Sequence, residues 1–366
     1  MAKTIELKKI NAEKIIRDCI GKKGIWASPT RYQDQCWTRD FSLAGLEALL
    51  SLGDEVSARK HLEELCRRQT SEGKIPILYF DNAIRCLTKK IWKTVTTGKM
   101  SYILKRSRNV ADLTPWTTDS EVNFVIAMHE YAAKTQDYQF LQEHRFSVQK
   151  AMSYIENNRL RNKLHLGGDW RDVMTQLEEK ALLSNNCLLY RAYSLSGEDK
   201  KASKLKGLIN THFWNGQHYQ DYSHSNSFDT LGQSLAILFE LVPKERYASI
   251  LRHYKVVECK YGYMTNNLSP APLTKEERLA IEKTNQYSIM WPFITGYAIQ
   301  ALDKMGESAK AQEMLKRWTA QDGFYEWYYP ESKTGSGSND QLWSAALYLQ
   351  TANVLERTKP IFPKPF

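Results

Sequence analysis

The sequence predicts an all-α fold in which pairs of helices are repeated around a closed ring, with little β structure. Five times an apolar helical segment ends in a short polar turn, and an amphipathic segment follows at once. The segments before the turns are apolar nearly all round, whereas those after them carry one apolar stripe, as expected for inner and outer helices. The last apolar segment, 342–349, lacks the polar face of a capping repeat, which favours a closed ring over an open solenoid.

The turns between paired helices share a simple chemistry. Glycine suits the C-terminus of a helix, and Asp, Glu and Pro suit the first turn of the next one. The five turns span residues 52–55, 135–138, 196–199, 242–245 and 305–308. Their regular recurrence indicates repeated helical hairpins.

The helices follow from these turns. The inner segments are expected at 41–52, 122–133, 182–195, 231–241, 289–302 and 342–349. Their amphipathic partners show spacings such as Ala311, Met314, Leu315 and Trp318, at i, i+3, i+4 and i+7. A further amphipathic segment at 10–20 completes an outer ring. We therefore predict an (α/α)6 barrel formed by one domain spanning 1–366, with short strands only near 74–79 and 218–222.

Composition restricts the class of protein. A hydrophobic content of 42% over 366 residues supports a large core, and no run of 18 apolar residues is present. The N-terminal residues lack the apolar core of a signal peptide. Six cysteines are scattered without a Cys-x-x-Cys pair, which predicts reduced thiols rather than a disulfide or zinc framework. We expect a cytoplasmic protein with no membrane partner.

The formal charge of +10 raises the question of a nucleic-acid partner. Basic residues concentrate locally in 89–108, but no helix-turn-helix, zinc-finger or RNA-binding signature accompanies them. We interpret this stretch as a solvated basic loop and expect no nucleic-acid partner, with contact to an anionic surface as the alternative. The longer segment 79–108 is predicted to be an insertion that folds over one end of the barrel as a lid.

The loops leading into the inner helices converge at one end of such a barrel. The first contains Trp37, Arg39 and Asp40. Adjacent charges ahead of a buried helix are costly unless they are used. Arg39 and Asp40 can donate to and accept from neighbouring hydroxyls, and Trp37 offers a stacking face. The alternative is a structural ion pair with Asp40 as the helix N-cap.

The second loop again places a tryptophan and an acid, Trp116 and Asp119, at the mouth of a helix. They are candidate pocket residues, although Asp119 could equally serve as an N-cap.

The third loop begins with Gly167 and Gly168, which permit an unusual backbone turn. The run Asp169-Trp170-Arg171-Asp172 comes directly after them. Burial beside an aromatic ring raises the pKa of a carboxyl group, so either Asp172 or Asp169 could act as a general acid. The alternative is a loop held together by a salt bridge to Arg171.

The last loop holds Glu326 among the aromatic residues of 324–329, followed by a Gly/Ser-rich stretch at 335–338. A carboxylate between rings that stack on sugars can act as an acid or a base. Tyr328, Trp291 and Trp343 are further candidate sugar contacts at this end. Two carboxylates across one cavity, here Asp172 and Glu326, are what inverting glycoside hydrolysis requires.

Other chemistries lack their signatures. The sequence contains no glycine-rich phosphate loop, no Gly-x-Ser-x-Gly elbow and no His-Glu-x-x-His motif. The eight histidines are dispersed. We therefore expect neither a cofactor nor a metal.

Three motifs in consistent order resemble those of a known group of enzymes. Trp37-Thr38-Arg39-Asp40 resembles a signature of glucoamylases, neutral/alkaline invertases and the glucosidase domain of glycogen debranching enzymes. Trp170-Arg171-Asp172-Val173-Met174 is similar to the segment that carries the general acid in debranching enzymes. Phe324-x-Glu326-x-Tyr328-Tyr329-Pro330, with Leu342-Trp343-Ser344-Ala345-Ala346 after it, resembles the ending of related (α/α)6 glycosidases, in which the glutamate is the base. Tyr329 departs from the pattern, because many relatives have Asp there.

The resemblance implies an inverting, exo-acting glycosidase. It assigns Asp172 as the acid and Glu326 as the base, and it places Arg39 and Asp40 on the hydroxyls of the sugar that is cleaved off. The expected partner is an oligosaccharide or disaccharide, with an α-glucoside as the first choice and an invertase-like fructosidase as the alternative. A carbohydrate-binding protein without hydrolytic activity is the rival from another class. A sugar epimerase or lyase on the same scaffold is a third option, although such enzymes usually use His or Tyr bases.

Overall fold

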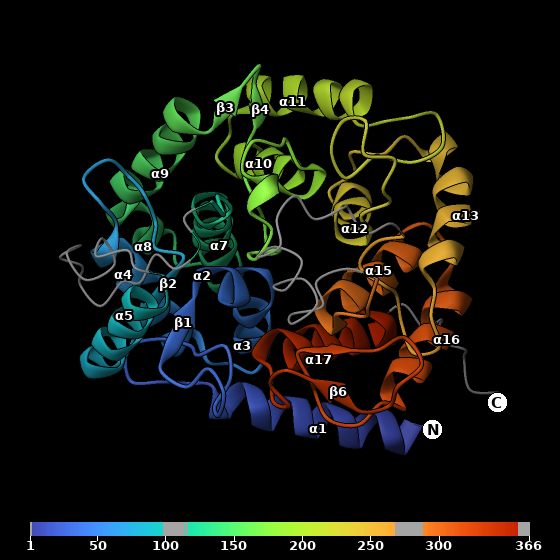
Figure 1. The fold of residues 1–366 in the computed structure, drawn as a ribbon, viewed down its shortest axis with the longest axis horizontal. Helices are drawn as coiled ribbons and strands as arrows, with labels where there is room; N and C mark the ends of the chain where they lie inside the picture. Colours follow the sequence, from blue (N-terminus) through green and yellow to red (C-terminus); the bar gives the residue numbers. More distant parts are fainter. Residues whose placement is uncertain (1, 98–113, 115, 268–287, 358–366) are drawn as a thin grey trace.

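The fold is a double ring of helices, as predicted (Figure 1). The structure is a computed structural model that describes residues 2–97, 114, 116–267 and 288–357. The inner ring of this described part contains the continuous segment α2 (Thr38–Asp40), η1 (Phe41–Gly45) and α3 (Leu46–Ser51), then α7 (Ser120–Thr135), α10 (Leu183–Leu195), α12 (Thr230–Leu238), α15 (Pro292–Lys304) and α17 (Leu342–Arg357). The outer ring contains α1 (Ala2–Asp18), α4 (Glu55–Arg68), α8 (Tyr138–Glu143), α9 (Arg145–Asn158), α11 (Asp199–His212), α13 (Tyr247–Val257) and α16 (Ser308–Thr319).

The ring is closed by contacts between the two ends of the chain. Helix α17 packs against α15 on one side and against η1 and α3 on the other, and α1 lies along its outer surface. At the start of α17 the backbone N–H of Leu342 donates to the carbonyl of Ala27 at 2.8 Å. These contacts confirm the prediction of a closed barrel completed by an N-terminal outer helix.

Burial distinguishes the two rings. Along α10 nearly every side chain from Leu183 to Ala192 is buried, including polar Asn185 and Asn186. Helix α16 instead buries the predicted stripe of Ala311, Met314, Leu315 and Trp318 and exposes its other face. Each large apolar side chain in such a stripe contributes about 1.5–3 kcal/mol when removed from water.

The helix boundaries differ from the predicted ones in several places. Helix α17 continues to Arg357 rather than ending at 349, and α1 already begins at Ala2 rather than at 10. Polar residues on the outward faces of these helices hide the continuation, because helix formation there depends on packing on one side only. Helix α15 begins at Pro292, three residues late, since proline favours the first helical position.

Strands are few and short. β1 (Gln35–Trp37) pairs antiparallel with β2 (Leu78–Phe80), with Trp37 opposite Leu78. β3 (Leu160–Arg161) pairs with β4 (Leu164–His165), and β5 (Trp327–Tyr328) with β6 (Gly335–Ser336). The strand expected at 74–79 is thus shifted towards Phe80. The one expected at 218–222 is reduced to isolated bridges, such as Gln220 with Phe228.

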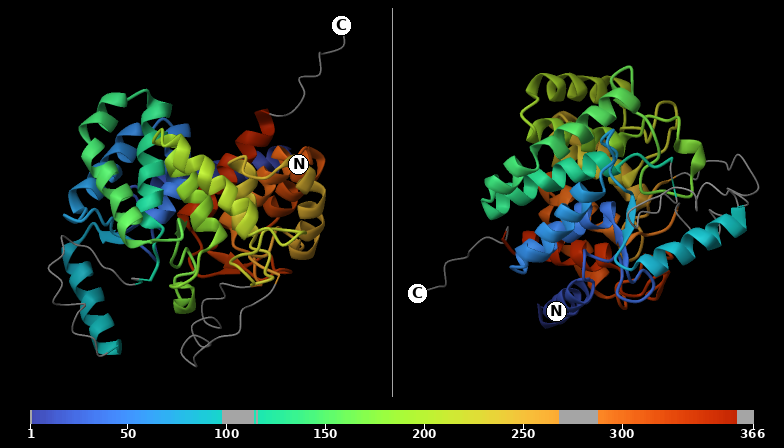
Figure 2. Two further views of the ribbon diagram at one scale, coloured as in Figure 1. Left: turned by 90° about the horizontal axis from the view of Figure 1, so that it is seen from above. Right: turned by 90° about the vertical axis from the view of Figure 1, so that its left-hand side faces the viewer.

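The predicted lid segment begins with β2 and continues as α5 (Ala83–Thr97), which projects away from the rings (Figure 2). Residues 98–108 of that segment lie outside the described residues. No disulfide joins the six cysteines, all of which belong to the described part of the chain. Within the same part, none of the helices combines the length and apolar character needed to cross a membrane.

Candidate active site

A pocket lies where the loops leading into the inner helices meet. Its lining comes from the loops before the first, third, fifth and sixth inner helices. The lining residues are Ala27, Tyr32, Trp37, Arg39, Asp40, Trp170, Asp172, Trp291, Glu326, Gln341 and Trp343. Asp172 and Glu326, which are far apart in the sequence, therefore face the same pocket, together with four tryptophans and Arg39.

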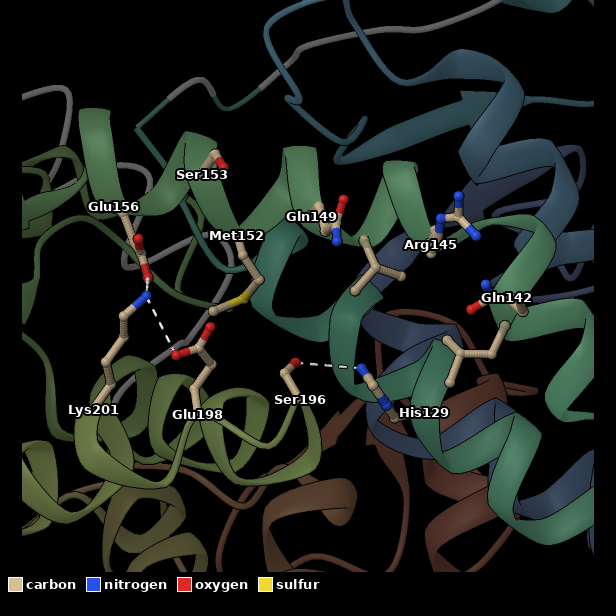
Figure 3. Close-up of a pocket in the computed structure, with 12 residues that line it drawn as sticks. His129, Gln142, Arg145, Gln149, Met152, Ser153, Glu156, Ser196, Glu198 and Lys201 are labelled. Atoms are coloured by element: carbon tan, nitrogen blue, oxygen red, sulfur yellow. Dashed lines mark hydrogen bonds and ion pairs between the residues drawn. The ribbon is translucent and has the colours of Figure 1, made fainter.

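A second, larger cavity lies in a groove that α7, α9 and the start of α11 border, with a volume of about 380 Å³ (Figure 3). Its charged groups are largely paired with each other. Lys201 Nζ lies 2.7 Å from Glu156 Oε1, and the Ser196 hydroxyl lies 3.3 Å from His129 Nε2. This groove has no tryptophan among its lining residues. We therefore place the candidate active site in the pocket that holds Asp172 and Glu326.

Glu326 is held from two directions just before β5. The Tyr32 hydroxyl donates to its two carboxylate oxygens at 3.0 and 3.1 Å, and the backbone N–H of Ser338 donates to Oε2 at 3.2 Å. Burial raises the pKa of Glu326, while the hydrogen bonds from Tyr32 and Ser338 oppose this rise. Both hydrogen bonds favour the ionised carboxylate, as a general base requires.

Gly337 leaves room for this carboxylate. Its φ angle is +82°, and a Cβ atom at this position would lie 2.3 Å from Glu326 Oε2. The Gly/Ser stretch after β5 therefore needs glycine here both for its left-handed backbone and for its close approach to Glu326.

Asp172 is positioned through its backbone and through Arg39. The indole N–H of Trp116 donates to the Asp172 carbonyl at 2.9 Å. Arg39 Nη2 lies 4.0 Å from Asp172 Oδ2, and Arg39 Nη1 donates to Asp119 Oδ2 at 3.0 Å. Arg39 thus links the first loop to both the second and the third.

The charge of Arg39 is secured by its surroundings. Burial acts to lower the pKa of this guanidinium, but the carboxylates of Asp119, Asp172 and Asp40 outweigh burial and raise it. The side chain of Asp119 forms this ion pair with Arg39 and does not cap α7. Asp119 thus occupies the N-cap position of α7, but its side chain makes no capping hydrogen bond.

Asp40 lies beside the two proposed catalytic groups. Gln341 Nε2 donates to its Oδ1 at 3.1 Å. Burial raises the pKa of Asp40 to about 7; Arg39 opposes this rise, and the negative charges of Glu326 and Asp172 add to it. Asp40 is the last residue of α2, which continues directly into η1, and its side chain makes no capping hydrogen bond.

Tryptophan rings form the apolar walls. Trp170 and Trp291 have ring centroids 5.0 Å apart, and Trp291 and Trp343 lie 5.6 Å apart. The indole N–H groups of Trp170 and Trp343 have no hydrogen-bond partner among the described residues. Aromatic walls of this kind can stack on the faces of a sugar.

Two predicted site residues of the third loop lie behind the pocket. Arg171 is fully buried and donates to Asp169 Oδ1 and Oδ2, each at 2.9 Å. It also donates to Asp221 at 2.6 and 2.9 Å, and the Ser184 hydroxyl donates to Asp169 at 2.7 Å. The salt-bridged loop, which the sequence left as an alternative, is what the structure contains for Asp169 and Arg171.

Eight of the thirteen predicted site residues line the pocket: Trp37, Arg39, Asp40, Trp170, Asp172, Trp291, Glu326 and Trp343. The other five are absent from its lining: Trp116, Asp119, Asp169, Arg171 and Tyr328. Tyr328 is buried and donates its hydroxyl to the carbonyl of Asp322 at 2.7 Å. We assign these five to positions that support the pocket rather than to contact with a ligand.

Sequence reasoning missed Tyr32 and Gln341. Tyr32 was detectable as an aromatic residue in a polar loop a few residues before Trp37. Gln341 immediately precedes an inner helix. Only the fold shows that both reach the carboxylates. No group of three His, Cys, Asp or Glu side chains in the described ranges is arranged to hold a metal.

No family model and no curated protein matches the sequence. A wild-type glycosidase of known structure is 17% identical, with a TM-score of 0.69 over 97% of each chain. The chain shares the fold of this glycosidase. A rhamnosidase from Klebsiella oxytoca with rhamnose bound is 14% identical, with a TM-score of 0.67 over 96% of this chain and 64% of its own. A mannosylglycerate hydrolase from Thermus thermophilus in complex with Tris is 12% identical, with a TM-score of 0.66 over 93% of this chain and 98% of its own.

Proposed function

We propose that this protein is a glycoside hydrolase that removes a terminal sugar with inversion of configuration. The observation that carries the proposal is that Asp172 and Glu326 line one pocket whose walls are tryptophans. Two carboxylates that share one pocket are the pair of groups that inverting hydrolysis needs. The fold shared with structures of glycosidases supports the same reaction class.

In the proposed reaction, Asp172 acts as the general acid and gives a proton to the glycosidic oxygen as the bond to the anomeric carbon breaks. Glu326 removes a proton from a water molecule that attacks the opposite face of that carbon. The products are a sugar of inverted configuration and the released alcohol. The hydrogen bonds from Tyr32 and Ser338 favour the ionised form of Glu326, which can accept this proton.

Arg39 and Asp40 are proposed to bind neighbouring hydroxyls of the terminal sugar, because a charged donor and an acceptor lie side by side in the lining. Our first choice of substrate is an α-glucoside, taken from the resemblance of the sequence motifs. Structures with the same fold include a glycosidase in complex with glucose and a rhamnosidase with rhamnose bound. A panel of disaccharides and nitrophenyl glycosides would identify the sugar.

Proton NMR of the first product anomer tests the mechanism, and retention of configuration would refute it. Asp172→Asn and Glu326→Gln should each lower kcat by a factor of at least about 10³ while thermal unfolding stays close to wild type. Near-normal turnover in either variant would remove the assigned role. Tight sugar binding without turnover by the wild-type protein would support the rival, a carbohydrate-binding protein.

A further inference from the structure

Helix α5 exposes an unusual row of large apolar side chains. The exposed fractions are 73% for Ile84, 52% for Leu87, 44% for Ile91, 67% for Trp92 and 74% for Val95. Positions 84, 87, 91 and 95 follow helical spacing and share one face, with Trp92 at its border. Single exposed apolar residues are ordinary, whereas a contiguous row of this kind marks an interaction surface.

The same part of the sequence is strongly basic. Residues 82–111 contain eight Lys and Arg residues and no Asp or Glu. Arg85 and Lys89, one turn apart, continue around the helix surface from Trp92, the border of the apolar row. An apolar face with a tryptophan, bordered by cations, is the pattern of a helix that lies in the interface of an anionic lipid bilayer.

The helix is fixed to the barrel in a way that leaves this face outward. Its Cys86 is buried in a cluster with Leu78 and Phe80 of β2, against which Trp37 also packs. Arg85 Nε lies 3.1 Å from Asp34 Oδ2. Figure 2 shows α5 (cyan) extending beyond the rings.

The anchoring contacts also place α5 next to the candidate active site. Trp37, which packs against the cluster that contains Cys86 of α5, also lines the pocket. Gln33, which accepts from Arg85 at 3.2 Å, directly follows Tyr32 in the chain. A surface bound by α5 would therefore lie close to the pocket mouth.

We propose that α5 docks this protein on an anionic lipid surface. The apolar row enters the headgroup region, and the exposed Lys89, which lies beyond Trp92 around α5, reaches anionic headgroups. A nucleic acid would use the cations but would gain nothing from five exposed apolar side chains. A second copy would bring two acid-free basic stretches together, which repel each other. This proposal replaces the expectation of a solvated basic loop without a membrane partner.

The test is co-sedimentation of the full chain with vesicles of phosphatidylcholine, alone or mixed with phosphatidylserine. Wild-type protein should sediment with the mixed vesicles, less so at high salt, and hardly with phosphatidylcholine alone. The double variant Ile91→Glu/Val95→Glu should lose at least about tenfold in affinity, and Lys89→Glu about fivefold, since each basic residue near the surface contributes measurably to binding. Val56→Glu is the matched control, because Val56 is 79% exposed but lies on α4.

Thermal unfolding of each variant separates loss of docking from loss of folding. Equal binding of wild type and the double variant to mixed vesicles would overturn the proposal, as would the absence of any binding. A wild-type dimer that becomes a monomer in the double variant, without a change in vesicle binding, would assign the face to a second copy instead. Vesicle binding is measured without sugar, so this outcome is independent of the proposed hydrolase activity.

Discussion

The hydroxyl of Tyr32 donates to both carboxylate oxygens of Glu326, at 3.0 and 3.1 Å, from a loop 294 residues earlier in the chain. This contact joins the two ends of the chain at the pocket. It fixes the orientation of the carboxylate that we propose as the base, and it stabilises the charged form of that group. Tyr32 thereby becomes a positioning residue whose loss should be visible in the pH dependence of the reaction.

Tyr32→Phe should move the acidic limb of the kcat/KM profile to higher pH by about one unit. A hydrogen bond to a charged group is worth roughly 1.5–3 kcal/mol, and its loss leaves burial to raise the pKa of Glu326 further. The base must lose its proton to act, so the variant needs a higher pH for the same activity. Tyr138→Phe, at an exposed site on α8, is the control. An unmoved limb in Tyr32→Phe would argue against Glu326 as the titrating base.

Gly337→Ala should reduce activity by about a hundredfold. The new Cβ would collide with the Glu326 carboxylate, and misplacing a catalytic group by about 1 Å can cost this much. Gly216→Ala is a matched control, because Gly216 has a φ of +96° but nothing within 4 Å of an added Cβ. Both variants should lose about 1 kcal/mol of stability from backbone strain, and only Gly337→Ala should lose activity. Equal activities would refute the steric explanation.

Asp40→Asn should change how stability depends on pH. The folded pKa of Asp40 is raised to about 7, mainly by burial, whereas the unfolded group titrates near 3.8. Its contribution to stability is therefore complete below about pH 4 and is lost as the pH rises through 7. Relative to wild type, the variant should gain roughly 2–4 kcal/mol in free energy of unfolding between pH 4 and 8. Urea denaturation at several pH values measures this difference, and a constant difference would contradict the raised pKa.

Arg171→Met should lower the free energy of unfolding by about 3–5 kcal/mol. Removing this buried guanidinium leaves the carboxylates of Asp169 and Asp221 without their partner. Arg59→Met provides the comparison, because Arg59 pairs with Asp137 at the surface and such pairs contribute about 1 kcal/mol or less. Equal losses in urea denaturation would show that the buried network does not have this structural role.

The sequence was sufficient for the architecture because local patterns repeat. Apolar segments alternating with one-sided helices specify inner and outer positions wherever they occur, and Gly306 or Gly53 at a left-handed turn marks where a hairpin reverses. The ends of α1 and α17 were harder to predict, since packing on one face stabilises helical residues that carry no strong apolar pattern.

In the candidate site, too, the sequence predicted the position of some residues and not of others. Trp37, Asp172 and Glu326 could be named from aromatic and acidic residues at helix mouths, and they line the pocket. Asp169 and Arg171 belong to the same local pattern, yet their side chains are buried in a salt-bridge network behind it. Which way a loop side chain turns depends on partners from other loops, such as Asp221, and nothing in the local sequence specifies those partners.

By itself, then, the sequence determined a ring of paired helices and the residue types gathered at one end of it, because helical periodicity and turn chemistry act over a few residues. Only the tertiary structure decided that Tyr32 and Gln341 reach the carboxylates while Arg171 does not line the pocket. It also decided that α5 keeps five apolar side chains exposed rather than covering the barrel with them. These outcomes depend on closing the ring, which brings residues hundreds of positions apart within hydrogen-bond distance.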